Sequence, residues 1–200
     1  MSALSELYEE ISLCRQCEIA KYRNKVVPGE GAEDAEIMFS GEAPGWHEDQ
    51  QGRPFVGPAG LYLDQLLASI NLKREQVYIA NVIKCRPPGN RDPLPSEMQE
   101  CHKWLQRQIE LISPKMIVTL GRYSMALFFS GKSISKIHGT AQKQDNIIYY
   151  AMYHPAAALH QQSLRQAIEA DMLKIPPLLA QAESIAPAKQ QSQQLNMFET

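Results

Sequence analysis

Apolar and polar positions along the chain form short buried runs that alternate with helical stripes. Four apolar runs have the length and residue types of strands, at 36–40, 77–83, 116–120 and 147–152. Between and after them, helical spacing predicts four helices, at 58–70, 96–112, 123–129 and 161–174. The four strands are separated by helices along the chain, which is the order typical of parallel sheets. We therefore expect a three-layer α/β/α fold with a central, mainly parallel four-stranded sheet.

Residues that typically begin or end helices support two of these boundaries. Ser96 and Gln99 have the spacing of a capping box, which predicts that the second helix begins at Ser96. Pro176 and Pro177 are expected to end the last helix, because proline disfavours helical backbone in the residue before it.

Chemically suggestive residues follow the predicted strands. The segment 41–49 comes after the first strand, Asn81 lies near the end of the second, and His154 follows the fourth. Ligands of parallel sheets bind beyond the carboxyl ends of the strands, so we expect one site there. Each residue also has a simpler interpretation: an asparagine in a strand often satisfies neighbouring backbone, and a single histidine is often structural.

The length of 200 residues suits one domain, which we place at residues 1–182. Residues 183–200 begin with a polar, low-complexity stretch and are expected to be a disordered tail. No apolar run has the length of a membrane span, and the first residues do not resemble a secretory signal, so we expect a cytoplasmic protein. The net charge of −2 excludes nucleic-acid binding by bulk charge, but not by a local basic patch.

Four cysteines, Cys14, Cys17, Cys85 and Cys101, are too few for a disulfide framework in that compartment. Incidental buried thiols are one interpretation, and a metal site with four thiolate ligands is another. Because only one CxxC pair is present, an iron–sulfur cluster suits the spacing at least as well as zinc. Spacing alone does not decide between the two metals.

The stretch from Gly41 to Gly60 is rich in glycine and proline and carries Glu42 and Phe55. It contains neither a dinucleotide-binding nor a P-loop pattern. Together with Cys14-x-x-Cys17, NVIKCRPPGNRDP at 81–93, Cys101 and YHPAAAL at 153–159, it closely resembles the family 4 uracil-DNA glycosylases, the iron–sulfur branch of that superfamily. These elements occur in family order and cover about residues 14 to 160.

The resemblance implies a role for each matching residue. It makes the four cysteines ligands of a four-iron four-sulfur cluster. Phe55 would stack on uracil, Asn81 would read its edge, and Gly41, Ala43 and Glu48 would complete the pocket, with Glu48 near uracil C5. His154 would bind uracil O2 as charge develops, and Glu42 would position or activate water or stabilise the cationic sugar.

DNA contacts are expected from residues beside the pocket: Lys84, Arg86 and Arg91 on phosphates, and Leu159 as a wedge into the gap left by the flipped base. For the basic residues a solvated surface is the simpler interpretation, and for Leu159 it is anchoring in the core. Some relatives trap uracil-DNA through a histidine in this region; the segment 87–95 has none, which favours turnover.

The last residues Gln194, Leu195, Met197 and Phe198 resemble the bacterial sliding-clamp-binding peptide. The expected protein is thus a monomeric uracil-DNA glycosylase that acts on uracil-containing DNA, starts base excision repair, and binds the sliding clamp through its tail. The alternatives are a catalytically weak damage-binding protein of the same fold and an iron–sulfur electron carrier.

Overall fold

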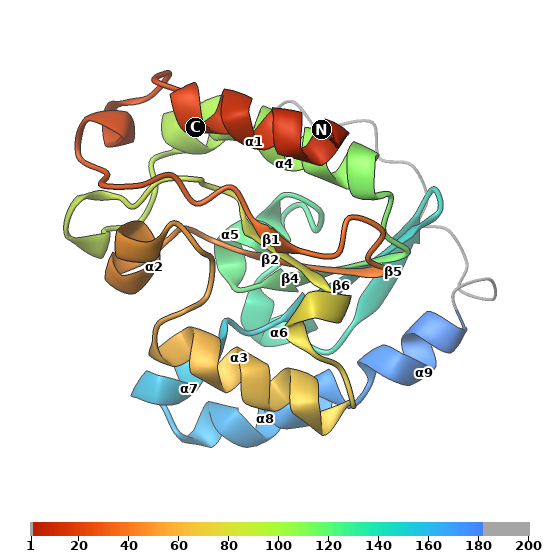
Figure 1. Ribbon diagram of the computed structural model, residues 1–200. Helices are drawn as coiled ribbons and strands as arrows, with labels where there is room; N and C mark the ends of the chain where they lie inside the picture. Colours follow the sequence, from red (N-terminus) through yellow and green to blue (C-terminus); the bar gives the residue numbers. More distant parts are fainter. Residues whose placement is uncertain (1, 182–200) are drawn as a thin grey trace.

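The computed structural model describes residues 2–181. Its strands form one sheet in the order β1-β3-β2-β4-β6-β5 (Figure 1). The four central strands are parallel and correspond to the four predicted runs: β3 (Tyr78–Asn81), β2 (Ile37–Gly41), β4 (Met116–Leu120) and β6 (Ile147–Met152). The prediction of a mainly parallel sheet is confirmed.

The count of four strands was wrong, because an antiparallel strand flanks the parallel core on each side. β1 (Glu30–Gly31) pairs with β3, and β5 (Ala141–Gln144) pairs with β6. Both edge strands are short and incompletely buried. Their sequences therefore lack the apolar run that marks a buried strand, and pairing with a neighbour defines them instead.

Helices cover both faces of the sheet, which gives the predicted three layers (Figure 1). On one face the core contains side chains of α1 (Ala3–Leu13), α4 (Pro95–Ile112) and α5 (Arg122–Ala126), with α6 (Ile134–Ile137) packed against it. On the other face lie α3 (Pro58–Ser69), α8 (Ser163–Met172) and α9 (Ile175–Ala180). The shorter elements are α2 (Trp46–Gln51), α7 (Pro155–His160) and the 3₁₀ helices η1 (Glu18–Lys21), η2 (Arg74–Gln76) and η3 (Pro88–Asn90).

Alternation along the parallel strands builds the two cores. In β2, Met38 packs into the core beneath α1 and α4, while Ile37 and Phe39 pack beneath α3 and α8. Successive strand side chains point to opposite faces, and here both faces are covered, so the whole strand is buried. This explains why the parallel strands appear in the sequence as continuous apolar runs.

Several predicted helix boundaries differ from the observed ones. α4 begins at Pro95, and its cap is formed by Glu97 Oε2, which accepts from the Leu94 N–H at 2.8 Å, rather than by Ser96 and Gln99. α5 ends at Ala126, before the predicted Phe129. Pro176 and Pro177 do not end the helix predicted at 161–174, because α8 already ends at Met172. The two prolines lie in the first turn of α9, where a missing N–H costs nothing.

None of the helices between residues 2 and 181 combines the length and apolar character that a membrane span requires. The predicted tail, with Gln194, Leu195, Met197 and Phe198, lies outside the described residues.

Candidate active site

A cleft opens where the loops after β2, β3 and β6 meet, at the carboxyl edge of the parallel strands. Its lining includes six residues that the sequence placed in a base pocket: Glu42, Ala43, Glu48, Phe55, Asn81 and His154. Segments 41–60, 81–92 and 154–160 are far apart in sequence and converge here because parallel strands end at the same edge. The expected single site is therefore present as a geometric feature.

Asn81 supplies a polar group that is ready for a ligand. Its side chain is 2% exposed, and its Oδ1 has no hydrogen-bond partner within the described part of the chain. Gly41 makes room for it: a Cβ at Gly41 would lie 2.4 Å from this oxygen and 2.6 Å from Phe55 Cζ. A buried acceptor left without a donor is costly, so its position in a cleft points to a ligand that donates there.

Phe55 has a left-handed backbone conformation, with φ of 51°, which is uncommon for a bulky residue. Two groups hold it. Arg74 Nη1 donates to the Phe55 carbonyl at 3.0 Å, and Gly60 lies so close that a Cβ there would be 1.8 Å from the same oxygen. Strain of this kind persists where surrounding contacts over-determine it, and it is common in binding sites. Sequence reasoning missed Arg74, which carries no motif signal.

Glu48 organises the loop that follows Phe55. Its Oε1 accepts from the N–H groups of Val56 and Gly57, both at 2.8 Å, and its Oε2 accepts from Gly45 N–H at 3.1 Å. The carboxylate lines the cleft, but its hydrogen bonds hold backbone. The contact with uracil C5 stays a prediction.

His154 is the N-cap residue of α7, and the first turn of that helix orients its side chain. Its Nδ1 accepts from the Ala156 N–H at 3.1 Å, so in the neutral ring the proton is on Nε2. Burial lowers the pKa of His154 to about 4, against an opposing effect of Glu48. The imidazole is therefore neutral at physiological pH and offers one N–H donor. Its ring stacks on that of Phe55, with centroids 5.4 Å apart and an interplanar angle of 25°.

Glu42 is another titratable group that lines the cleft. Burial raises the pKa of its carboxyl to about 7, the nearby negative charge of Asp92 adds to this, and Arg122 opposes it. Arg122 Nη2 in turn pairs with Asp92 Oδ2 at 2.5 Å. A carboxyl with a pKa near 7 is suited to proton transfer or water activation at neutral pH. Sequence reasoning did not find Asp92, which lies in an exposed loop, or Arg122, which is exposed at the first position of α5.

The prediction that Lys84 contacts DNA is wrong. Lys84 is 1% exposed, and its Nζ donates inward to the Asn81 carbonyl at 2.7 Å and to Gln108 Oε1 at 2.6 Å. The nearby basic residues Arg86 and Arg91 suggested a charged surface, but the side chain of Lys84 points into the core.

The other predicted DNA contacts are on or near the surface. Arg91 lines the cleft and makes a two-pronged ion pair with Glu97 (2.8 and 2.6 Å), while Arg86 Nε donates to Asn90 Oδ1 at 2.7 Å. Leu159 is 51% exposed, so it does not anchor the loop in the core. His160 also lines the cleft.

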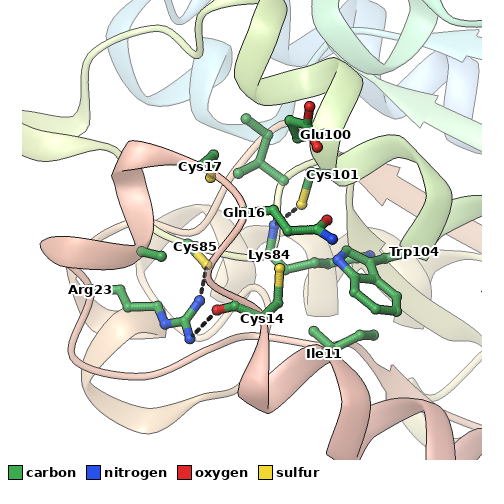
Figure 2. A pocket seen from close by; sticks show the side chains of 12 residues that line it. Ile11, Cys14, Gln16, Cys17, Arg23, Lys84, Cys85, Glu100, Cys101 and Trp104 are labelled. Atoms are coloured by element: carbon green, nitrogen blue, oxygen red, sulfur yellow. Dashed lines mark hydrogen bonds between the residues drawn. The ribbon is translucent and has the colours of Figure 1, made fainter.

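The four cysteines lie around one small pocket between α1, η1 and α4 (Figure 2). Cys14 follows α1, Cys17 precedes η1, Cys85 follows β3, and Cys101 lies on α4. Arg23 Nη1 donates to Cys85 Sγ at 3.0 Å, and the Lys84 backbone N–H donates to Cys101 Sγ at 3.3 Å. Burial raises the pKa of Cys101 to about 12, so without a cation this thiol keeps its proton.

Two further observations describe this pocket. Trp104 lines it, is 7% exposed, and has an Nε1–H without a hydrogen-bond partner in residues 2–181. Within the same residues, no three His, Cys, Asp or Glu side chains converge closely enough to hold a single metal ion. The thiols thus surround a space rather than meet at a point.

Comparison with known proteins gives consistent results. A family model described as the uracil DNA glycosylase superfamily matches residues 28–174. A Type-4 uracil-DNA glycosylase of Sulfurisphaera tokodaii is 48% identical over 188 residues, which is 89% of this chain and 86% of the relative. Proteins of the same name from Archaeoglobus fulgidus (46%; 89% and 94%) and Saccharolobus solfataricus (43%; 90% and 88%) are also similar.

Proposed function

This chain belongs to the uracil DNA glycosylase superfamily, and we propose that it hydrolyses the N-glycosidic bond of uracil in DNA to leave an abasic site, the first step of base excision repair. The observation that carries the proposal is the unpartnered, buried Oδ1 of Asn81 in the cleft. Uracil N3–H is the donor that this oxygen lacks, and the Asn81 amide N–H₂ would donate to uracil O4.

The same amide explains rejection of cytosine. Cytosine has an acceptor at N3 and a donor at N4, so both of its groups would oppose those of Asn81. A site that hydrogen-bonds its substrate rejects such an analogue strongly, because buried polar groups would be left unpaired. The target base would reach this cleft by leaving the DNA stack, and the ring of Phe55, which lines the cleft, would offer it an apolar face.

The cleft supplies groups for both charges that cleavage creates. As the bond breaks, negative charge develops on uracil, and the Nε2–H of neutral His154 would donate to uracil O2. Positive charge develops on the sugar, and the Glu42 carboxylate would stabilise it and position the attacking water. The abasic sugar then keeps the hydroxyl from water, and uracil leaves with the proton.

Loss of uracil from oligonucleotides tests the function directly. Purified protein should convert single- or double-stranded DNA with one uracil into a product with one alkali-labile site, and should leave the matching cytosine oligonucleotide intact. A protein that binds uracil-DNA without creating such sites would instead be the damage-binding protein considered above.

The ionisation of Glu42 predicts the pH dependence. The carboxylate is the active form and its pKa is about 7, so kcat/KM should fall about tenfold per pH unit below pH 7. His154 adds no step there, because its pKa is about 4. In Asp92→Asn, loss of a neighbouring negative charge should move the inflection to lower pH. A pH–rate profile of both proteins measures this, and an unmoved inflection would contradict the assignment to Glu42.

We further propose that the four cysteines hold a four-iron four-sulfur cluster. The donor set fits: in such a cluster each of the four thiolates would bind its own iron, and the four cysteines line one pocket. Sulfur atoms of a cluster and of its thiolate ligands accept hydrogen bonds. Suitable donors are the unpartnered Trp104 Nε1–H, the Arg23 guanidinium that donates to Cys85, and the Lys84 backbone N–H that donates to Cys101. Such a cluster would tie α1, η1, the loop after β3 and α4 together.

Anaerobically purified protein should therefore be brown and contain four irons and four sulfides per chain, by the proposed stoichiometry. Cys101→Ala should lose the colour and unfold at a lower temperature, because one ligand and the link to α4 are lost. Absorbance spectra, metal analysis and thermal unfolding measure this. Colourless protein that binds zinc stoichiometrically would contradict the cluster.

Two expectations complete the proposal. Arg86, Arg91 and Leu159 contact DNA beside the cleft, supported by their exposure or cleft position. The peptide at 194–198 binds the sliding clamp, supported by its sequence. Binding of purified clamp to chains with and without residues 194–198 tests this contact, and intrinsic glycosylase activity serves as the control.

A further inference from the structure

Lys84 connects the base cleft with the cysteine pocket. Its Nζ donates to the backbone carbonyl of Asn81 at 2.7 Å. Its backbone N–H donates to Cys101 Sγ at 3.3 Å (Figure 2). The side chain is 1% exposed, so both contacts are made in the protein interior. One residue thus contacts the asparagine that faces the cleft and a cysteine of the other pocket.

A buried polar chain fixes the position of this ammonium. Gln108 Oε1 accepts from Lys84 Nζ at 2.6 Å, and Gln108 Nε2 donates to the Pro28 carbonyl and to Tyr78 Oη, both at 2.8 Å. Since Nε2 has two acceptors, the amide of Gln108 can present only its oxygen to Lys84. Gln108 lies on α4, the helix that also carries Cys101.

The charge of Lys84 has no carboxylate partner in the described residues, where both of its Nζ acceptors are neutral oxygens. A buried charge is costly unless an opposite charge compensates it. Cys85 is the next residue in the chain, and Cys101 Sγ accepts from the Lys84 backbone N–H. A cluster held by these four thiolates would be anionic overall and would supply the opposite charge.

We infer that Lys84 is a positioning residue that couples the cysteine pocket to base recognition. Its ammonium holds the Asn81 carbonyl, and therefore the direction of the Asn81 amide, while the anionic cluster compensates its charge. The inference rests on the proposed function, because it needs both the cluster and the role of Asn81. It assigns the cluster an electrostatic effect on uracil recognition in addition to holding segments together.

Lys84→Met tests this coupling, because methionine is apolar and of similar length and leaves the backbone N–H on Cys101. Two changes are expected in the cluster-loaded protein. The reduction potential should become more negative, since a nearby buried cation no longer stabilises the added electron. KM for uracil-DNA should rise at least tenfold with a smaller change in kcat, since Asn81 is less well held.

Lys103→Met is the matched control. Lys103 lies over the Trp104 ring, 4.6 Å from its centroid, on the same helix as Cys101, but is not fully buried. Water screens its charge, so potential and KM should stay at the unsubstituted values. If Lys84→Met also leaves either quantity unchanged, the coupling is wrong. Lys84→Arg, which keeps the charge, should restore the potential, and failure to do so would exclude a charge effect.

Iron and sulfide in the unsubstituted protein are measured first, so that the two proposals fail separately. Their absence contradicts the cluster, whereas unshifted Lys84→Met values in loaded protein contradict only the coupling. If the variants do not fold, ¹⁵N-lysine spectra of the unsubstituted protein decide. The slowly exchanging ammonium signal of Lys84 should shift on cluster reduction and again on uracil binding. If its chemical shift does not change on uracil binding, the inference is overturned.

Discussion

Replacing His154 with alanine should lower kcat for uracil excision by about 10²–10³-fold, the usual cost of losing one donor to a developing oxyanion. The neutral ring donates from Nε2 because Nδ1 is occupied by the Ala156 N–H. The loss should be the same at pH 6 and pH 8, because the pKa of about 4 keeps the ring neutral at both. Single-turnover rates measure this without interference from product release.

The matched variant is His154→Gln, whose side chain still offers an N–H donor. It should retain more activity than the alanine variant, while binding of uracil-DNA changes little in either. If alanine and glutamine are equally impaired, or if the loss is confined to KM, donation in the transition state is not the role of His154.

Replacing Asn81 with aspartate should have the other large effect, on the choice of base. A carboxylate accepts but does not donate, so it opposes uracil O4 and matches the N4 amino group of cytosine. Sites that hydrogen-bond their substrate reject an unmatched analogue by about 10⁴–10⁵-fold, and we expect the preference for uracil over cytosine to fall by at least about 10³-fold. Paired uracil and cytosine oligonucleotides measure the ratio of kcat/KM.

Asn81→Ala provides the control for that prediction. It removes the donor and the acceptor together, so uracil excision should fall while cytosine excision stays undetectable. Gly41 is left unchanged in both variants, because a Cβ there would meet the Asn81 oxygen and Phe55. Unaltered preference in Asn81→Asp would show that another group reads the base edge.

The sequence predicted the parallel core and the convergence of the cleft because both follow from local patterns. Strands buried on both faces must be apolar throughout, and this makes 116–120 and 147–152 recognisable without a structure. Parallel strands end at one edge, so residues that follow them meet. The edge strands β1 and β5 escaped prediction because pairing, rather than apolar composition, makes them strands.

Charge was the least predictable property of the site. Arg74 and Glu48 hold the strained backbone around Phe55, and Asp92 raises the pKa of Glu42, yet none of these contacts follows from spacing in the sequence. A carboxylate or guanidinium acts on whatever lies within a few ångströms in space. Those neighbours come from different loops, and only the folded chain brings them together.

By itself, the sequence determined the α/β class, the edge of the sheet that carries the cleft, and the family whose motifs fill it, since these depend on residue types at fixed spacing. Only the tertiary structure decided where Lys84 points. Its neighbours Arg86 and Arg91 are basic too, but the strand end buries Lys84 against Gln108 and Asn81. Direction into or out of the core depends on packing against distant elements, and no local pattern encodes it.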